Sequence, residues 1–370
     1  MSKILQVNVD DIGMGGVFAL VRNVVRLRPP GSVVDIAAIE PFERRANVEL
    51  LRDCGCTVHH VGRGGSKILK NVAAFLNLRK LLASCRYDAV HIHADVANKL
   101  LVSACAAKLA GCGRVIVHSH ASGVDGNNRC LKLVLHHACR RLLRYVATDY
   151  LSCSDLATEW MFPNVGRGRV VLIRNGVDLE RFRYSPSVRE RLREEMGIGG
   201  KLVVGHVGRF AYQKNHDYLI DVFNALHSER PDSVLLLVGE GPLERDIRAK
   251  VDALGLSDSV IFCGVCPNIS DLMQAMDVFV LPSHFEGLPI VGVEAQAAAL
   301  PCVFSDKISR KAKIFADVEF LPIEDSVLAS WVAAIERLAS NRREDSYDTM
   351  REAGFSIEDT VSQLWRVYEK

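Results

Sequence analysis

Short apolar runs alternate with helical segments along most of this chain, and the alternation occurs twice. Each apolar run has the length of a buried strand, and each intervening segment has the spacing of a helix. The expected strands of the first series are residues 4–9, 33–39, 57–61, 89–93, 115–120, 150–152 and 170–173, and those of the second are 202–206, 233–238, 260–262, 277–281, 302–304 and 318–320. Strands that alternate with helices in this way predict doubly wound parallel sheets, so we expect an α/β fold.

A change of composition separates the two series. Residues 183–201 combine a Ser-Pro step, a densely charged run and a glycine cluster, which is typical of a linker with a short helix. Single cores stop growing near about 250–300 residues, and this chain has 370. We therefore expect one domain over 1–182 and a second over 202–355, followed by a helix over 356–370.

Charge is distributed unevenly between the two halves. Residues 1–182 carry 25 Lys and Arg side chains against 15 Asp and Glu, whereas the rest of the chain carries 21 against 29. A basic first half favours an acidic partner, such as an anionic membrane surface, a phosphate-bearing substrate or nucleic acid; a solvated basic face is the alternative. Part of this charge lies in a basic amphipathic helix expected over 130–145, which suits either an anionic membrane or an ordinary surface position.

The sequence disfavours a membrane-spanning protein and a secreted protein. No run approaches the roughly 18 uninterrupted apolar residues of a spanning helix, and the first segment reads as a strand rather than a signal peptide. Eleven scattered cysteines, an odd number, favour reduced thiols in the cytoplasm. The pairs Cys54/Cys56 and Cys263/Cys266 lack a second pair at zinc-ligand spacing, so we expect no metal at either.

The segment 277–300 carries the clearest binding motif. An apolar run is followed by a glycine-containing turn, and an almost wholly apolar helix is expected over 290–300 with Pro289 at its first position. Unpaired N–H groups and the helix dipole make such a helix start an anion site. Two carboxylates flank it, Glu286 before the helix and Glu294 inside it.

Two cations are expected at the same edge of the second sheet. Arg209 and Lys214 follow the strand 202–206, and the carboxyl ends of parallel strands open on one edge. A guanidinium, an ammonium and a helix N-terminus together suit a diphosphate. Glu294 can accept hydrogen bonds from ribose hydroxyls, so the set predicts a nucleotide diphosphate site in the second domain.

Glycines and histidines follow strands of the first domain. Gly15 and Gly16 lie in a Gly-rich turn that lacks the dinucleotide-binding spacing, so they indicate either close backbone approach to a ligand or a plain tight turn. Two further strands end in histidine pairs, at positions where a parallel sheet binds ligands; polar capping is the alternative, and carboxylate partners for a metal are missing. These histidines are His91, His93, His118 and His120.

Together these motifs resemble those of the retaining glycosyltransferases of family 4. The resemblance covers nearly the whole chain and rests on Gly15-Gly16, His120, residues 175–178, Gly208-Arg209, Lys214, residues 239–242, and Glu286 with Glu294 inside 277–306. It implies the GT-B architecture, in which two Rossmann-like domains face a central cleft and the last helix, 356–370, packs back on the first domain. The chain looks most like the subgroup that builds bacterial capsular polysaccharides and exopolysaccharides.

The resemblance also implies a role for each site residue. Arg209 and Lys214 would hold the diphosphate of a sugar nucleotide and stabilise it as a leaving group. Glu286 would contact the transferred sugar, His120 would lie beside that sugar, and Glu294 would bind the ribose. The other donor-binding residues would be Gly15 and Gly16 near the diphosphate, Gly287 and Leu288 at phosphate and sugar hydroxyls, and Val265 and Cys266 at the base.

The expected activity is transfer of a hexose from a nucleotide diphosphate sugar, with a UDP sugar favoured, to a lipid-linked or saccharide acceptor. The departing phosphate would deprotonate the acceptor. No Asp-x-Asp motif for a divalent metal occurs, so no metal or cofactor is expected, nor a nucleic-acid partner. The enzyme would be cytoplasmic and peripheral at the inner face of the cell membrane. An isomerase of the UDP-sugar 2-epimerase kind and a catalytically silent nucleotide-sugar-binding subunit are the alternatives. One departure, Ala299 where relatives carry Gly, is expected to affect only helix–loop packing.

Overall fold

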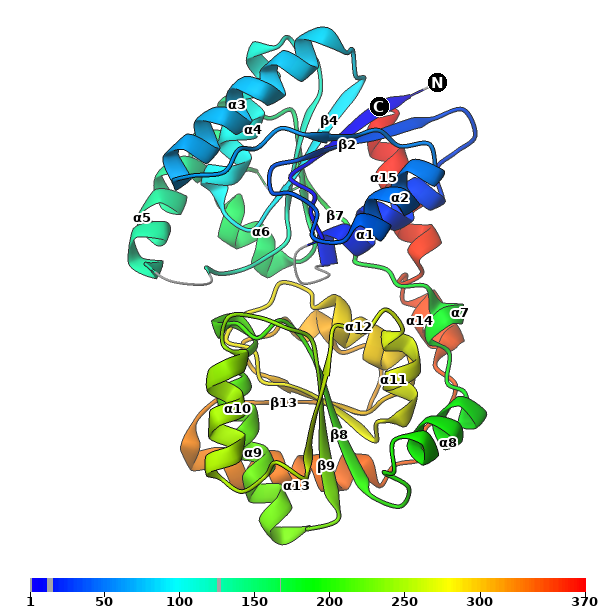
Figure 1. The fold of residues 1–370 in the computed structure, drawn as a ribbon. Coiled ribbons are helices and arrows are strands. Elements are labelled where there is room, and N and C mark those ends of the chain that lie inside the picture. The colour runs from blue at the N-terminus through cyan, green and yellow to red at the C-terminus, as the bar shows by residue number, and fades with distance from the viewer. Residues whose placement is uncertain (1, 12–15, 125–127, 167) are drawn as a thin grey trace. The chain divides into compact units, whose positions relative to one another are not determined.

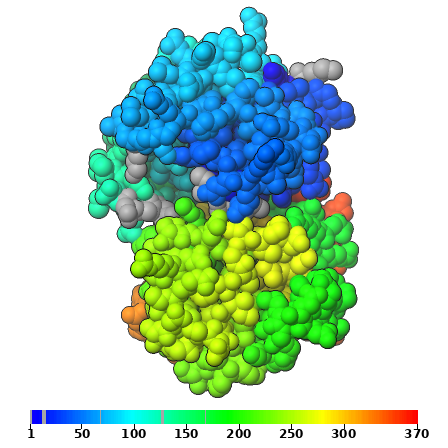
Figure 2. All heavy atoms as spheres, in the orientation of Figure 1, coloured from blue at the N-terminus to red at the C-terminus, as the bar shows by residue number. Residues whose placement is uncertain are grey.

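The computed structural model describes all residues except 1, 12–15, 125–127 and 167. The chain forms two compact units (Figure 1): Met1–Arg174 with Glu358–Lys370, and Asn175–Ile357. Figure 2 draws all heavy atoms of the chain in the same orientation. The first unit thus ends at residue 174 rather than at 182. The segment 183–201 is not a separate linker, because its helix packs inside the second unit.

The first unit contains a seven-stranded parallel sheet in the order β3-β2-β1-β4-β5-β6-β7. Its strands are β1 (Lys3–Val7), β2 (Val33–Ala38), β3 (Val58–His60), β4 (Ala89–Ala94), β5 (Val115–Ser119), β6 (Asp149–Ser152) and β7 (Val170–Leu172). Its helices are α1 (Gly16–Arg26), α2 (Arg45–Asp53), α3 (Lys67–Ser84), α4 (Ala97–Leu109), α5 (Arg129–Arg140), the short η2 (Leu143–Tyr145), α6 (Asp155–Met161) and the C-terminal α15 (Ile357–Tyr368). Helix α15 belongs to this unit although it closes the chain.

The second unit contains a six-stranded parallel sheet in the order β10-β9-β8-β11-β12-β13. Its strands are β8 (Leu202–Val207), β9 (Ser233–Val238), β10 (Val260–Gly264), β11 (Val278–Leu281), β12 (Cys302–Ser305) and β13 (Val318–Leu321). Its helices are α7 (Leu179–Phe182), α8 (Pro186–Glu195), α9 (His216–Glu229), α10 (Glu244–Ala253), α11 (Ile269–Ala275), α12 (Ile290–Ala297), α13 (Leu328–Ala339) and α14 (Tyr347–Glu352), with single turns η3 (Tyr212–Lys214), η4 (Arg310–Ala312) and η5 (Asp325–Val327).

Both sheets therefore run third–second–first–fourth–fifth–sixth strand, the order of a Rossmann fold. The expected doubly wound parallel α/β fold is confirmed. The order in which successive strands are added to the sheet reverses between the first and fourth strands. These are β1 and β4 in one unit and β8 and β11 in the other. Ligands of such sheets bind beyond the carboxyl ends of these two strands. Among the described residues, no helix combines the length and the hydropathy that crossing a membrane requires.

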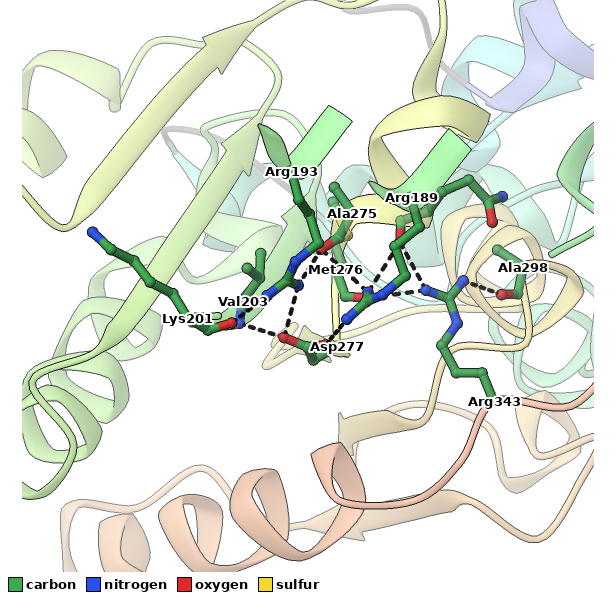
Figure 3. A network of polar contacts seen from close by, with 10 residues as sticks. Arg189, Arg193, Lys201, Val203, Ala275, Met276, Asp277, Ala298 and Arg343 are labelled. Atoms are coloured by element: carbon green, nitrogen blue, oxygen red, sulfur yellow. Dashed lines mark hydrogen bonds and ion pairs between the residues drawn. The ribbon is translucent and has the colours of Figure 1, made fainter. Parts of the chain in front are cut away.

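An ion cluster anchors β11 at the end opposite to this edge (Figure 3). Asp277, just before β11, pairs with both Arg189 and Arg193 of α8, and it accepts the backbone N–H of Val203 at 2.7 Å. Arg343 joins the cluster by donating to backbone carbonyls, including that of Met276 at 3.0 Å. Burial lowers the pKa of Arg343 to about 9. These contacts fix α8 against the sheet, which is why the predicted linker belongs to the second unit.

Candidate functional site

The loops after β8 and β9 continue the sheet beyond its strands. Gly208 donates its N–H to the carbonyl of Val238 at 2.9 Å, and Phe210 donates to Glu240 at 3.0 Å. Gly239 has a φ of +135°, and a Cβ there would lie 2.2 Å from the carbonyl oxygen of Gly208. Only glycine fits at that crossing. The backbone that carries Arg209 is therefore held firmly at the edge of the sheet.

The two predicted cations are in different environments. Arg209 is exposed, and its side chain has no ion pair with any residue that the structure describes. Lys214, in η3, is largely buried and donates from Nζ to Oε1 of Glu286 at 2.7 Å. Ser283 donates to the same oxygen at 3.3 Å. The sequence placed Lys214 and Glu286 in separate roles, whereas here they form one ion pair.

The turn between β11 and α12 is held against the loop after β8. The carbonyl of Gln213 accepts the N–H of His284 at 2.8 Å, and its amide donates to the carbonyl of Phe285 at 3.2 Å. From another segment, the amide of Asn175 donates to the carbonyl of Leu288 at 3.1 Å. These bonds fix the turn that carries Glu286 next to the loop that carries Arg209 and Lys214.

Helix α12 starts where the sequence predicted but ends earlier. Pro289 is its N-cap residue rather than its first helical residue, and the helix spans Ile290–Ala297. The N-cap residue Pro289 makes no side-chain hydrogen bond to the first turn, so within the described part of the chain it leaves the N–H groups of Ile290 and Val291 to an anion. Gly287 and Leu288 are buried just before it, and Glu294 is half-buried in its second turn.

The expected base-binding residues lie at the same edge of the sheet. Val265 and Cys266 directly follow β10 and are half-buried. Strands β9 and β8 separate β10 from β11. With neighbouring strands about 4.8 Å apart, the edge from β10 to β11 spans about 14 Å. This row is long enough for several groups of an extended ligand to bind in sequence.

Two buried histidines beside Lys214 were not predicted. His206 on β8 shares a 2.8 Å hydrogen bond through Nδ1 with the carbonyl of Val280. His216 begins α9, and neither ring nitrogen has a hydrogen-bond partner among the described residues. Burial lowers the pKa of His206 to about 3 and that of His216 to about 2, with the charge of Lys214 acting in the same direction. Both are therefore neutral near Lys214. Nothing in the sequence around these two histidines, one in a strand and one at a helix start, indicated that they are buried beside Lys214.

In the first unit the four predicted histidines form one cluster. His120 follows β5, is half-buried, and shares a 2.8 Å hydrogen bond through Nε2 with Nδ1 of His93. His91, His93 and His118 are fully buried, so only His120 keeps exposed surface. The three buried rings also offer nitrogens within 4.8 Å of one another, close enough for a metal ion. Gly16 begins α1 and is exposed. Gly15 lies outside the described residues.

The basic helix expected over 130–145 is divided. Helix α5 covers Arg129–Arg140, and η2 follows it. His136 and Arg140 face the unit's interior, because both bond the carbonyl of Trp160, at 3.0 and 2.8 Å. The predicted basic face is therefore narrower. Its exposed members include Arg141 and Arg144, together with His137 and Arg129.

Comparison with known proteins identifies the family. Residues 14–181 match the model described as "Glycosyltransferase Family 4", and residues 188–356 match "Glycosyl transferases group 1". A Bacillus subtilis (strain 168) protein described as a glycosyltransferase, EpsF, is 34% identical over 292 residues, which cover 76% of this chain and 74% of that protein. The chain belongs to glycosyltransferase family 4.

Further relatives of this glycosyltransferase have more specific descriptions. The Escherichia coli UDP-Gal:alpha-D-GlcNAc-diphosphoundecaprenol alpha-1,3-galactosyltransferase is 28% identical over 287 residues, 74% of this chain and 72% of that protein. The crystal structure of Anabaena HepE with UDP-glucose superimposes with a TM-score of 0.79 at 20% identity, covering 100% of both chains. These likenesses confirm the GT-B fold, the family and the enzyme class. The roles of individual residues stay predictions.

Proposed function

We propose that this glycosyltransferase moves a hexose from a UDP sugar to a lipid-linked or saccharide acceptor, with retention of configuration, during assembly of a bacterial surface polysaccharide. One observation carries the proposal. Exposed Arg209, the Lys214–Glu286 pair and the uncapped N-terminus of α12 gather beyond the adjacent strands β8 and β11. Cationic side chains and free N–H groups at a Rossmann switch point suit a diphosphate.

The rest of the edge supplies the other donor contacts in this proposal. Glu294 binds the ribose, the Gly287 and Leu288 amides bind phosphate and sugar hydroxyls, and Val265 and Cys266 lie along the base. A UDP donor is supported by the name of the Escherichia coli galactosyltransferase and by the UDP and UDP-glucose bound in the HepE structures. Glu286 exchanges its bond to Lys214 for a sugar hydroxyl, which leaves Lys214 to the phosphate.

The proposed reaction breaks the bond between the anomeric carbon and the phosphate oxygen. The electron pair leaves with the diphosphate, whose charge Arg209 and Lys214 stabilise, and the sugar becomes oxocarbenium-like. The acceptor hydroxyl then attacks from the face that the phosphate leaves, and a phosphate oxygen takes its proton. His120 contacts the transferred sugar. Because side chains supply the positive charge, we expect turnover to persist in excess EDTA.

Surface features support a lipid-linked acceptor at an anionic membrane. Helix α5 exposes Leu131 and Val134 at 69% and 67%, and no acidic residue occurs between 126 and 148. Helix α3 exposes Ile68 at 75%, with Leu69, Val72 and Leu76 also exposed, and it too contains no acidic residue. Both helices pack against α4 (Figure 1). Exposed apolar side chains on helices that carry basic and no acidic residues favour peripheral binding to anionic lipid, which we place at the cytoplasmic face.

Transfer is tested with UDP-glucose and UDP-galactose by following UDP release and by NMR of the product's anomeric proton. We expect an α-linked product from an α-linked donor. Lys214→Ala should lower kcat/KM by about 10²–10³-fold, because a preorganised charge at the leaving group is lost. Lys201→Ala is the matched control, since Lys201 adjoins the opposite end of β8 (Figure 3). Unchanged turnover in Lys214→Ala would refute the diphosphate assignment. A donor epimerised without acceptor would indicate an isomerase, and no turnover a silent subunit.

Membrane binding is tested by co-sedimentation with vesicles of phosphatidylglycerol and phosphatidylcholine. The double variant Arg141→Glu/Arg144→Glu should bind anionic vesicles about tenfold or more weakly, since each basic residue near such a surface contributes about 1 kcal/mol. Arg245→Glu/Arg342→Glu makes the same charge change at exposed positions of the second unit and should bind as wild type does. Equal binding by both double variants would contradict the proposed surface.

A further inference from the structure

The first unit holds a row of buried polar side chains on one face of its sheet. Gln6 on β1 is in register with His91 on β4, and His93 is in register with His118 on β5. Because side chains two residues apart share a face of a strand, His120 extends the same row. All are fully buried except His120, which is half-buried. The row therefore reaches the surface at one end only.

Helix α15 supplies the hydroxyl group that orders this row. Oη of Tyr368 accepts from the amide nitrogen of Gln6 at 3.0 Å and lies 2.7 Å from Nδ1 of His91. Arg114 fixes the end of the helix by donating to the carbonyl of Tyr368 at 3.0 Å. Burial raises the pKa of Tyr368, so the phenol keeps its proton. That hydroxyl accepts from Gln6, and among the described residues Nδ1 of His91 is the acceptor within reach of its proton, so we assign the proton to a bond to His91.

This donation determines which nitrogens carry the protons in the first branch of the network, which runs from Tyr368 through His91 to His118. Nδ1 of His91 must be bare to accept from Tyr368, so His91 carries its proton on Nε2. That N–H points to Nδ1 of His118 at 3.1 Å. His118 then carries its own proton on Nε2, an atom that is buried without a partner among the described residues. The first branch therefore ends inside the protein.

The orientation of Gln6 determines the second branch. Its amide nitrogen faces Tyr368, so its oxygen faces His93 and accepts from Nε2 of that ring at 2.8 Å. His93 is then bare at Nδ1, where it accepts from Nε2 of His120 at 2.8 Å. His120 is left with its proton on Nε2 and a bare Nδ1. Burial lowers the pKa of His120 to about 4 and lowers those of the other three rings, so all four are neutral and only their tautomers can vary.

We propose that Gln6 and Tyr368 are positioning residues that hold His120 in its Nε2–H tautomer, so that Nδ1 accepts a hydrogen bond from a hydroxyl of the transferred sugar. Only the sugar contact rests on the proposed function; the tautomer is a property of the free protein. A reversed Gln6 would turn its nitrogen toward His93, and the proton would move to the opposite nitrogen in both His93 and His120. In the orientation that the structure gives, the hydroxyl of Tyr368 accepts from the amide of Gln6 and so couples the tautomers of the two branches.

The tautomer is measured by long-range ¹H–¹⁵N correlation spectra of the full chain labelled in histidine, with His120→Gln to assign the resonances. We expect a protonated Nε2 and a bare Nδ1 in the wild type. Tyr368→Phe removes the hydroxyl and should give a mixture of His120 tautomers. Tyr87→Phe is the matched control, because the buried hydroxyl of Tyr87 donates instead to Asp35 at 2.9 Å; it should leave the tautomer unchanged.

Kinetics provide the second readout. Tyr368→Phe should lower kcat by about tenfold, the equivalent of one misplaced hydrogen bond, with the KM for the donor unchanged within about twofold. Gln6→Leu should behave in the same way and serves if the tyrosine variant folds poorly. A proton on Nδ1 of His120 in the wild type, or an unchanged tautomer in both variants, would overturn the proposal. One equivalent of Zn²⁺ that shifts the resonances of His91, His93 and His118 together would also overturn it, because a metal and the relay need the same lone pairs. A correct tautomer in a protein that transfers no sugar would instead count against the proposed function.

Discussion

The two sheets of this enzyme share a strand order, and each has an aspartate just before its fourth strand that accepts a backbone N–H from the start of its first strand. Asp88 precedes β4 and accepts the backbone N–H of Lys3 at 2.7 Å; Asp277 precedes β11 and accepts that of Val203 at the same distance. The two aspartates differ in their surroundings. Asp88 is exposed, whereas Asp277 lies among arginines. The same topology thus requires the same carboxylate, while the residues packed around it decide how strongly it is held.

The carboxyl ends of the strands differ more between the two units. In the first unit, four neutral histidines and Tyr368 of α15 occupy the carboxyl ends of β4 and β5. In the second, an ion pair and an exposed arginine occupy the ends of β8 and β11. Helix α15, from the far end of the chain, packs on the histidines of the first unit. The polar groups there are therefore neutral rings that hydrogen-bond to one another and to Tyr368. The second row keeps its charges, with Lys214 and Glu286 largely buried as an ion pair and Arg209 exposed.

Lowering the pH should affect the two units unequally, and this is the largest effect we expect. An unfolded histidine has a pKa near 6.5. Burial lowers the pKa values of seven histidines, so below about 6.5 the unfolded chain binds protons that the folded chain does not, and stability falls as pH falls. Each such group lowers stability by about 2 kcal/mol at pH 5. The first unit contains His91, His93, His118, His120 and His136, and the second contains His206 and His216.

Hydrogen exchange followed by mass spectrometry at pH 7.5 and pH 5 measures this difference, after correction for the intrinsic exchange rate. The amides of the first unit should lose protection first, and those of β8, β9 and β11 should lose it at lower pH. Protection lost equally in both units would show that the covered histidines do not control acid stability.

Replacing each of the two equivalent aspartates, Asp277 and Asp88, by asparagine should give the next largest effect on stability. Asp277→Asn leaves Arg189 and Arg193 partly buried without their carboxylate, which should destabilise the enzyme by about 3–5 kcal/mol. Asp88→Asn loses one charge-assisted bond at an exposed position and should cost about 1 kcal/mol. Urea denaturation of both variants measures the difference. Similar losses would mean that the cluster around Asp277 contributes little beyond the backbone bond common to both sites.

Two glutamates of the second sheet should separate catalysis from binding. Glu286→Gln breaks the ion pair with Lys214 and should lower kcat by about 10²-fold, with a smaller change in the KM for the donor. Glu294→Ala should instead raise that KM by about tenfold, because it removes hydrogen bonds to the ribose. Steady-state kinetics of both variants with one donor tests this. If Glu294→Ala leaves donor affinity unaltered, the ribose assignment is wrong.

The sequence predicted the architecture well because strand length and spacing report directly on a parallel sheet. It also placed Arg209, Lys214 and Glu286 at one edge, since topology alone brings the carboxyl ends of strands together. It did not predict that Lys214 and Glu286 bond each other, because the contact joins two loops 72 residues apart. It also did not predict which histidines are buried. A period of two shows which side chains share a face, but not that α15 packs on that face.

The ends of the helices that follow the two fourth strands give the smallest and cleanest comparison. Two residues beyond the end of α4 lies Gly111, with a φ of +83°, and two residues beyond the end of α12 lies Ala299, with a φ of +54°. Both residues lie in the same hydrogen-bonded motif, with the next residue donating to a carbonyl five positions back: Cys112 to Ala107, and Leu300 to Ala295. The expectation that Ala299 affects only packing is therefore wrong, because a side chain at this φ strains the backbone.

Exchanging the two residues should shift stability in opposite directions. Ala299→Gly relieves the strain and should stabilise the second unit by about 1 kcal/mol, less whatever the small buried methyl group contributes. Gly111→Ala introduces the same strain at a position where a Cβ has open space, so it should destabilise the first unit by about 1 kcal/mol through conformation alone. Thermal unfolding of the two variants checks both signs. If Ala299→Gly is also destabilising, burial of the methyl group outweighs the strain, and the two helix ends are equivalent in geometry but not in energy.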